Sequence, residues 1–148
     1  MAPIGGPTGG GQSGFGSGGS FTGPAEALEI IGDFAYAYSG KMSTNTSVQT
    51  ALSFTTGNYV FVGRIQCTGP VSEVTAQNGR ISTWRMELNT AVIGYIKADT
   101  TDDFEGTTPS YVEVIIPPYT VVDVYVDSNS TDSDFYNSVM MAGRIYRE

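Results

Sequence analysis

Few residues in this chain are of a type that performs catalysis. Its 148 residues include no histidine and a single cysteine, Cys67, with fifteen acidic and seven basic residues. Without histidine the chain lacks the usual general base near neutral pH, the Ser-His-Asp and Cys-His systems, and most zinc sites. One thiol cannot form an internal disulfide or hold an iron–sulfur cluster, so we interpret Cys67 as a small core residue. The sequence predicts a protein that is not an enzyme and uses no cofactor.

Acidic residues are the remaining candidates for chemistry, and they gather in two segments, 99–103 and 127–134. Carboxylates and amides spaced two to three residues apart resemble what calcium takes from a loop. Neither segment matches the twelve-residue calcium loop that ends in a chelating glutamate. We therefore expect solvated polar turns and no metal site, with calcium at Asp127–Asp134 as the alternative. A glycosidase would need two carboxylates that converge on a cleft, and this stays the enzymatic alternative.

Tyrosines are the other candidates, because their rings can stack on sugars or form subunit contacts. Tyr111, Tyr119 and Tyr125 are our candidate surface contacts. If the three cluster in an open groove, carbohydrate binding is favoured, and if other subunits cover them, assembly is favoured. The tyrosines that could line such a surface are Tyr36, Tyr38, Tyr59, Tyr95, Tyr111, Tyr119, Tyr125 and Tyr146.

The charge pattern argues against two classes of partner. The net charge is −8, and the lysines and arginines are scattered without a basic stripe. We therefore expect no nucleic-acid binding, and an anionic membrane surface would repel the chain. The first residues have no signal-peptide pattern, and no window reaches transmembrane length.

The elements that must position these side chains begin after a segment of different character. Residues 1–23 are nearly all Gly, Ser, Thr, Pro and Gln, and such a segment cannot offset its ordering entropy alone. Its few apolar residues, Ile4, Phe15 and Phe21, suggest an extended arm that docks on a neighbouring protein. Residues 24–32 carry a proline near the start and Gly32 at the end, which fits a short helix or an extended hinge.

From Asp33 to the end, residues 33–148, apolar side chains recur with a period of two, which predicts about eight strands. Trp84 shares a face with Met86 and Leu88, so we assign it to the core. Pro117-Pro118 and Asn89-Thr90 are turn signals between strands. The sequence therefore predicts an all-β fold, a jelly-roll-like antiparallel sandwich. The predicted strands centre on Phe34–Tyr38, Val48–Phe54, Tyr59–Ile65, Trp84–Leu88, Ala91–Ile96, Val112–Ile116, Thr120–Val126 and Val139–Tyr146.

Four segments of this domain carry a resemblance to a known family. They are Ala35-Tyr-Ala-Tyr-Ser-Gly40, Leu52-Ser-Phe-Thr-Thr-Gly57, Ile116-Pro-Pro-Tyr-Thr-Val-Val-Asp-Val124 and Met141-Ala-Gly-Arg-Ile-Tyr146. With them, residues 24–148 resemble the small jelly-roll virion proteins of tailed bacteriophages, including marine and cyanobacterial phages. The Gly-rich arm departs from the usual family pattern and leaves the mode of attachment open.

The resemblance implies a virion location and a structural role, as a head decoration or cement protein or a minor capsid subunit. It brings no catalytic residues to this chain. The expected partners are the major capsid protein or other virion subunits, together with further copies of the chain, with a trimer favoured. The alternative function is a carbohydrate- or receptor-binding module of a phage fibre or spike.

Overall fold

The computed structural model describes residues 25–72, 79–99 and 110–147. The predicted arm, with Ile4, Phe15 and Phe21, lies outside these residues. The described part is all-β, with no helix, so it contains no helix able to cross a membrane. Its strands are β1 (Glu29–Ile31), β2 (Phe34–Tyr38), β3 (Met42–Thr44), β4 (Gln49–Thr55), β5 (Val60–Ser72), β6 (Ile81–Leu88), β7 (Ala91–Asp99), β8 (Ser110–Ile116), β9 (Val121–Ser128) and β10 (Asp132–Tyr146).

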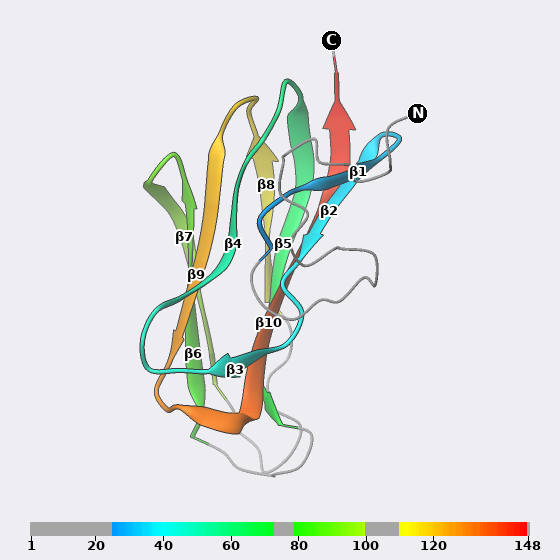
Figure 1. Ribbon diagram of the computed structural model, residues 1–148. Helices are drawn as coiled ribbons and strands as arrows, with labels where there is room; N and C mark the ends of the chain where they lie inside the picture. The colour runs from blue at the N-terminus through cyan, green and yellow to red at the C-terminus, as the bar shows by residue number, and fades with distance from the viewer. Residues whose placement is uncertain (1–24, 73–78, 100–109, 148) are drawn as a thin grey trace.

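The strands form two antiparallel sheets packed face to face (Figure 1). The six-stranded sheet has the order β1-β2-β10-β5-β8, with the short β3 also paired to β10. The four-stranded sheet has the order β4-β9-β6-β7. All strand pairs are antiparallel, and the longest ladder joins β10 to β5.

Connectivity confirms the predicted jelly-roll-like sandwich. When the three-residue strands β1 and β3 are set aside, eight strands remain, in the orders β2-β10-β5-β8 and β4-β9-β6-β7. Every connection along the chain except β6 to β7 passes from one sheet to the other. This is the double Greek-key arrangement of a jelly roll.

The core lies between the sheets, because alternate residues of each strand point inward. The predicted core residues Trp84 and Met86 are fully buried, and Cys67 is buried among them. Inward residues of the four-stranded sheet also include Val122, Val124 and Val126, and the six-stranded sheet contributes Phe61, Ile65, Ile116, Met141 and Ile145.

Strand β4 departs from the predicted alternation. A register shift between Thr50 and Leu52 places a bulge at Ala51, so Ala51 and Leu52 are both fully buried. Val48, which a strict alternation over the predicted strand would place on the same side as Leu52, lies before the bulge and is exposed. A bulge inserts one residue and therefore reverses which side chains face the core on its two sides.

Residues 25–32 contain no helix, and their last part is the strand β1. Ala25 makes a parallel bridge to β4, donating its N–H to Ala51 O (3.1 Å) and accepting from Ser53 N–H (3.0 Å). Gly32 has a φ of 62° and starts the two-residue turn of the β1–β2 hairpin. A glycine with positive φ occurs both just after a helix and in hairpin turns, so Gly32 alone did not distinguish a helix from an extended segment. Since Ala25 and Leu28 are buried, the domain begins before Asp33.

Two of the predicted turns have clear chemistry. Asn89 and Thr90 both have positive φ, 50° and 68°, as a tight β-hairpin requires, and Asn89 Oδ1 accepts the Val121 N–H at 2.8 Å. After Pro117-Pro118 the chain turns at Tyr119, with a φ of 55°. The buried Thr56 hydroxyl secures this turn, since it donates to Pro117 O at 3.1 Å and accepts from Thr120 N–H at 2.8 Å.

Candidate functional site

The three tyrosines predicted as surface contacts do not form one groove. Tyr111 is on β8 and points outward from the six-stranded sheet, while Tyr125 is on β9 and points outward from the four-stranded sheet. Tyr119 is exposed in the turn between these strands. The two sheets face away from each other on these sides, so a ligand cannot touch Tyr111 and Tyr125 together.

The outer surface of the six-stranded sheet exposes several large apolar and aromatic side chains. Cross-strand register builds it in rows, because directly opposed residues share a face. In one row Arg144 of β10 lies between Phe34 of β2 and Val62 of β5. Val62 in turn lies opposite Ile115 of β8. We call this surface the six-stranded face, formed by Phe34, Tyr36, Tyr38, Val62, Arg64, Gln66, Tyr111, Glu113, Ile115, Met140, Ala142 and Arg144.

Large apolar side chains on this face are open to solvent. Phe34 is 60% exposed and Ile115 is 68% exposed, and Val62, Met140 and Tyr111 are also exposed. Because apolar area in water costs about 25 cal/mol per Å², a contiguous face of this kind is typical of a surface that another molecule covers.

Two arginines of the same face lie over aromatic rings. The Arg64 guanidinium lies 4.5 Å from the centre of the Tyr111 ring. Arg144 lies 5.3 Å from the ring centre of Phe34 and 5.8 Å from that of Tyr146, and it pairs with Asp33 at 3.8 Å. Stacking of this kind orders long side chains before any partner arrives, which lowers the entropy cost of binding.

Two hollows mark the six-stranded face. One has a volume of about 510 Å³ and runs over β5, β8 and β10 between Arg64, Glu113 and Ile115. The other has a volume of about 250 Å³ and lies between Tyr38, Gln66 and Met140. Both hollows are open to solvent, so protruding side chains of a partner can enter them.

A glycine pair on the inward side supports the same strands. Gly63 of β5 and Gly143 of β10 are directly opposite, and the ring of the buried Phe61 lies over both of them. A Cβ on either glycine would come closer than 3 Å to the Phe61 ring. Because neither glycine has a side chain, the Phe61 ring can pack directly against the backbone of β5 and β10. The opposite side of these two strands forms part of the six-stranded face.

The second acidic segment is mostly strand rather than loop. Asp127 and Ser128 end β9 and Asp132 begins β10, so only three residues connect the two strands. The polar turn that we expected over 127–134 is therefore limited to residues 129–131, because charged residues on an outward strand face resemble a turn in sequence. Residues 100–103 of the first acidic segment lie outside the described residues.

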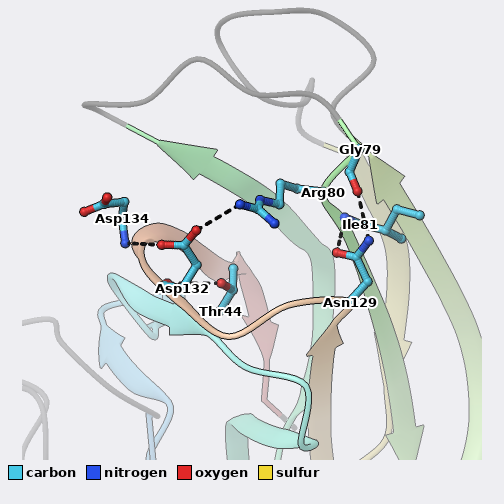
Figure 2. Close-up of polar contacts among 7 residues, drawn as sticks. All are labelled: Thr44, Gly79, Arg80, Ile81, Asn129, Asp132 and Asp134. Atoms are coloured by element: carbon cyan, nitrogen blue, oxygen red, sulfur yellow. Dashed lines mark hydrogen bonds and ion pairs between the residues drawn. The ribbon is translucent and has the colours of Figure 1, made fainter.

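Polar groups at this turn serve the fold (Figure 2). The Asp132 carboxylate accepts from Arg80 Nη2 at 3.1 Å and from the Asp134 N–H at 2.9 Å. The Asn129 side chain accepts from Ile81 N–H at 3.0 Å and donates to Gly79 O at 2.9 Å. Within residues 25–72, 79–99 and 110–147, no group of three or more acidic, histidine or cysteine side chains is arranged to hold a metal.

A buried polar cluster joins the two sheets and had no signal in the sequence. Ser82 Oγ donates to Asn137 Oδ1 at 2.7 Å, and Asn137 Nδ2 donates to Ser128 Oγ at 3.2 Å. The two serine hydroxyls lie 2.8 Å apart and close the ring. Ser82 and Ser128 belong to the four-stranded sheet and Asn137 to the six-stranded sheet, so the cluster fixes their relative position.

Among the described residues, the structure shifts the pKa of the Cys67 thiol and of three tyrosine hydroxyls, those of Tyr36, Tyr59 and Tyr125. Burial raises the pKa of the Cys67 thiol to about 12, so the thiolate that would act as a nucleophile is disfavoured. The pKa of the Tyr125 hydroxyl is also raised, first by desolvation and then by the carboxylates of Asp123 and Glu87, against the opposing effect of Arg85. Tyr125 therefore keeps its hydroxyl proton and remains a hydrogen-bond donor.

Comparisons with known proteins add little to this description. No protein-family model matches the chain, and no curated protein sequence matches it. Among solved structures, the capsular polysaccharide assembling protein CapF from Staphylococcus aureus is similar at a TM-score of 0.22 and 12% sequence identity. The match covers 86% of this chain and 32% of CapF, and at that TM-score it carries no argument.

Proposed function

We propose that this chain is a non-enzymatic structural subunit of a bacteriophage virion, a decoration or minor capsid protein that works by binding its neighbours. The observation that supports this best is the six-stranded face, whose exposed apolar and aromatic side chains nothing in the described chain covers. The jelly-roll order of the strands agrees with the family resemblance, and the resemblance supplies the virion setting.

The composition of the six-stranded face fits a protein partner. Interface cores are enriched in Tyr, Phe, Met and Arg and depleted in Lys. The face contains Phe34, Met140, Arg64, Arg144 and several tyrosines, and none of its residues is lysine. The partner in the proposal is the major capsid protein or another virion subunit.

Two further contacts complete the proposal. The arm, residues 1–23, extends the contact through Ile4, Phe15 and Phe21, and wrapping by such a segment adds area at the cost of ordering entropy. Further copies of the chain associate with it, with a trimer favoured. Strands β7 and β8 end their sheets, and such edges can pair with other chains.

Cryo-electron microscopy of purified virions tests this directly, because it gives both the stoichiometry and the buried surface. We expect density for the sandwich on the particle with Phe34 and Ile115 against a neighbouring subunit. A particle without this protein, or one that contacts it through other surfaces only, would contradict the proposal.

Reassembly with variants gives a quantitative version of the test. Burying one Ile side chain is worth about 1.5–3 kcal/mol, so Ile115→Ser should weaken attachment to particles lacking the protein by roughly 10- to 100-fold. Val48→Ser is the matched control, since Val48 is also exposed but lies by the other sheet. Equal attachment of the two variants would count against the six-stranded face.

A further inference from the structure

The outer surface of the four-stranded sheet has a different chemistry. Arg85 of β6 lies directly between Tyr125 of β9 and Tyr95 of β7, one residue on each neighbouring strand. Their chain neighbours, among them Trp84, Val124 and Ile96, fill the core. Because successive residues of a strand alternate, the row of Tyr125, Arg85 and Tyr95 points to solvent.

The arginine in this row is held in place. Its guanidinium carbon lies 4.7 Å from the centre of the Tyr125 ring, and its Nε donates to Glu87 Oε2 at 2.7 Å. Within the described part of the chain, the Nη groups of Arg85 donate to no protein acceptor. A positioned guanidinium with free donors is suited to binding oxygen atoms of a ligand.

The row borders a hollow with further polar groups. The hollow has a volume of about 110 Å³ and is lined by Val48, Thr83, Arg85, Tyr95, Tyr125, Val126 and Asp127. Tyr95 is 65% exposed, so most of its side chain is free for contact. Thr83 and Asp127 lie opposite each other in the register, and among residues 25–72, 79–99 and 110–147 neither side chain has a hydrogen-bond partner. The site thus combines exposed ring surface, hydrogen-bond donors and acceptors within a few side chains.

This combination identifies a class of ligand. A pyranose ring has an apolar C–H face that stacks on a tyrosine, and vicinal hydroxyl groups that bond carboxylate, hydroxyl and guanidinium groups. Charged residues lie among the rings here as they do on the six-stranded face, but this hollow is much smaller, which suits a small ligand better than the side chains of a protein partner. Small ligand sites usually join apolar walls to a few placed polar groups, as this hollow does.

The charge of this surface further narrows the class of saccharide that it can bind. Outward residues of this sheet include the carboxylates of Glu87, Asp123 and Asp127 against the cations Arg85 and Lys97, and the chain has a net charge of −8. Sulfated or uronic saccharides would be repelled by this surface. We propose that the row of Tyr125, Arg85 and Tyr95, with Thr83 and Asp127, binds a neutral saccharide. The proposal is independent of the assembly role, because it uses the opposite sheet.

Saturation-transfer NMR on the full chain tests the proposal with defined probes. The probes are the methyl glycosides of glucose, galactose, mannose, N-acetylglucosamine and N-acetylgalactosamine, together with lactose and cellobiose. We expect signals on the ring C–H protons of at least one probe, with a Kd in the millimolar range. Tyr95→Ala should weaken that binding about tenfold, by loss of one stacked ring, while Tyr95→Phe should retain it.

Two controls make each outcome decisive. Tyr111→Ala removes an exposed tyrosine from the other sheet and should leave saccharide binding unchanged, and circular dichroism confirms that each variant is folded. The proposal would be overturned if no probe gave a saturation-transfer signal. It would also be overturned if a probe bound equally well to the wild type, Tyr95→Ala and Arg85→Ala. Tighter binding of glucuronate than of methyl glucoside would overturn the neutral class. If the row serves only cross-strand stability, its variants lower the melting temperature and no probe gives a signal.

Discussion

Replacing Gly63 with alanine is expected to destabilise the sandwich, because β5 and β10 approach closely at this position. A Cβ on Gly63 would lie 2.7 Å from the Cα of Gly143 and 2.7 Å from Cζ of Phe61, and it would also meet the carbonyl oxygen of Ala142. Carbon atoms pack best at about 3.5–4.0 Å, so each carbon contact is short by roughly 1 Å. Two of the three atoms belong to backbone, which cannot rotate away.

The size of the effect follows from these contacts. Added carbon in a well-packed core costs about 1–3 kcal/mol, and a clash with backbone puts Gly63→Ala near the upper end of that range. For a chain of this size each kcal/mol lowers the melting temperature by about 2–4 °C. We therefore expect Gly63→Ala to melt roughly 6–12 °C below the wild type.

Trp84 provides the assay, since it is the only tryptophan of the chain and is fully buried. Thermal unfolding followed by its fluorescence reports the loss of the core. Gly94→Ala is the control, because a Cβ there meets only Cε of Met86 at 3.7 Å, an ordinary contact. Its stability should stay within about 0.5 kcal/mol of the wild type. If both variants melt together with the wild type, the packing of Phe61 over the glycine pair is wrong.

Two other predictions concern buried groups. Asn137→Ala should lower the free energy of unfolding by about 1–3 kcal/mol in urea titrations, because it removes two hydrogen bonds of the buried cluster and leaves the Ser82 and Ser128 hydroxyls bonded only to each other. The exposed Asn58→Ala is its control, and equal stability of the two would contradict the role of the cluster. For Cys67, whose pKa rises from 9.0 to about 12 on folding, burial favours the neutral thiol, so its contribution is complete below pH 9 and is lost between pH 9 and 12. Wild-type stability should therefore fall relative to Cys67→Ala by about 1.4 kcal/mol per pH unit in that window, and a constant difference would refute this.

The sequence predicted the sandwich because most strands bury one face only. The alternation of Trp84 and Met86, and of Val122 and Val124, reports burial directly, and all four residues are buried in the core. The turn residues between strands were equally informative, since a turn such as Asn89-Thr90 needs a specific backbone conformation. These signals are local, and local signals suffice to count strands.

Features that depend on neighbouring strands could not be predicted. The strands β1 and β3 have three residues each, too few to show a period. The first half of β10 has polar residues on both faces, and its inward Asn137 became interpretable only when Ser82 and Ser128 were found beside it. From the sequence alone, a buried polar residue that has a hydrogen-bond partner cannot be distinguished from a polar residue exposed to water.

The same limit applies to the candidate surfaces. Tyr95, Arg85 and Tyr125 come from three strands, and they form a row only because β6 lies between β7 and β9. Tyrosine content suggested a binding face, but the selection of Tyr111, Tyr119 and Tyr125 joined residues from different surfaces. Strand order, which a single sequence does not reveal, decides which tyrosines share a face.

The back-to-back arrangement of the sheets makes the two proposed surfaces separable. Sheets in a sandwich pack about 10 Å apart, so side chains on the two outer faces do not touch. Effects of substitutions at that separation usually add, without coupling. Ile115→Ser should therefore weaken attachment to the particle while leaving saccharide binding as in the wild type, and Tyr95→Ala should do the reverse. A protein held by its six-stranded sheet would then present the row of Tyr125, Arg85 and Tyr95 to the surrounding solution, where a neutral saccharide can reach it.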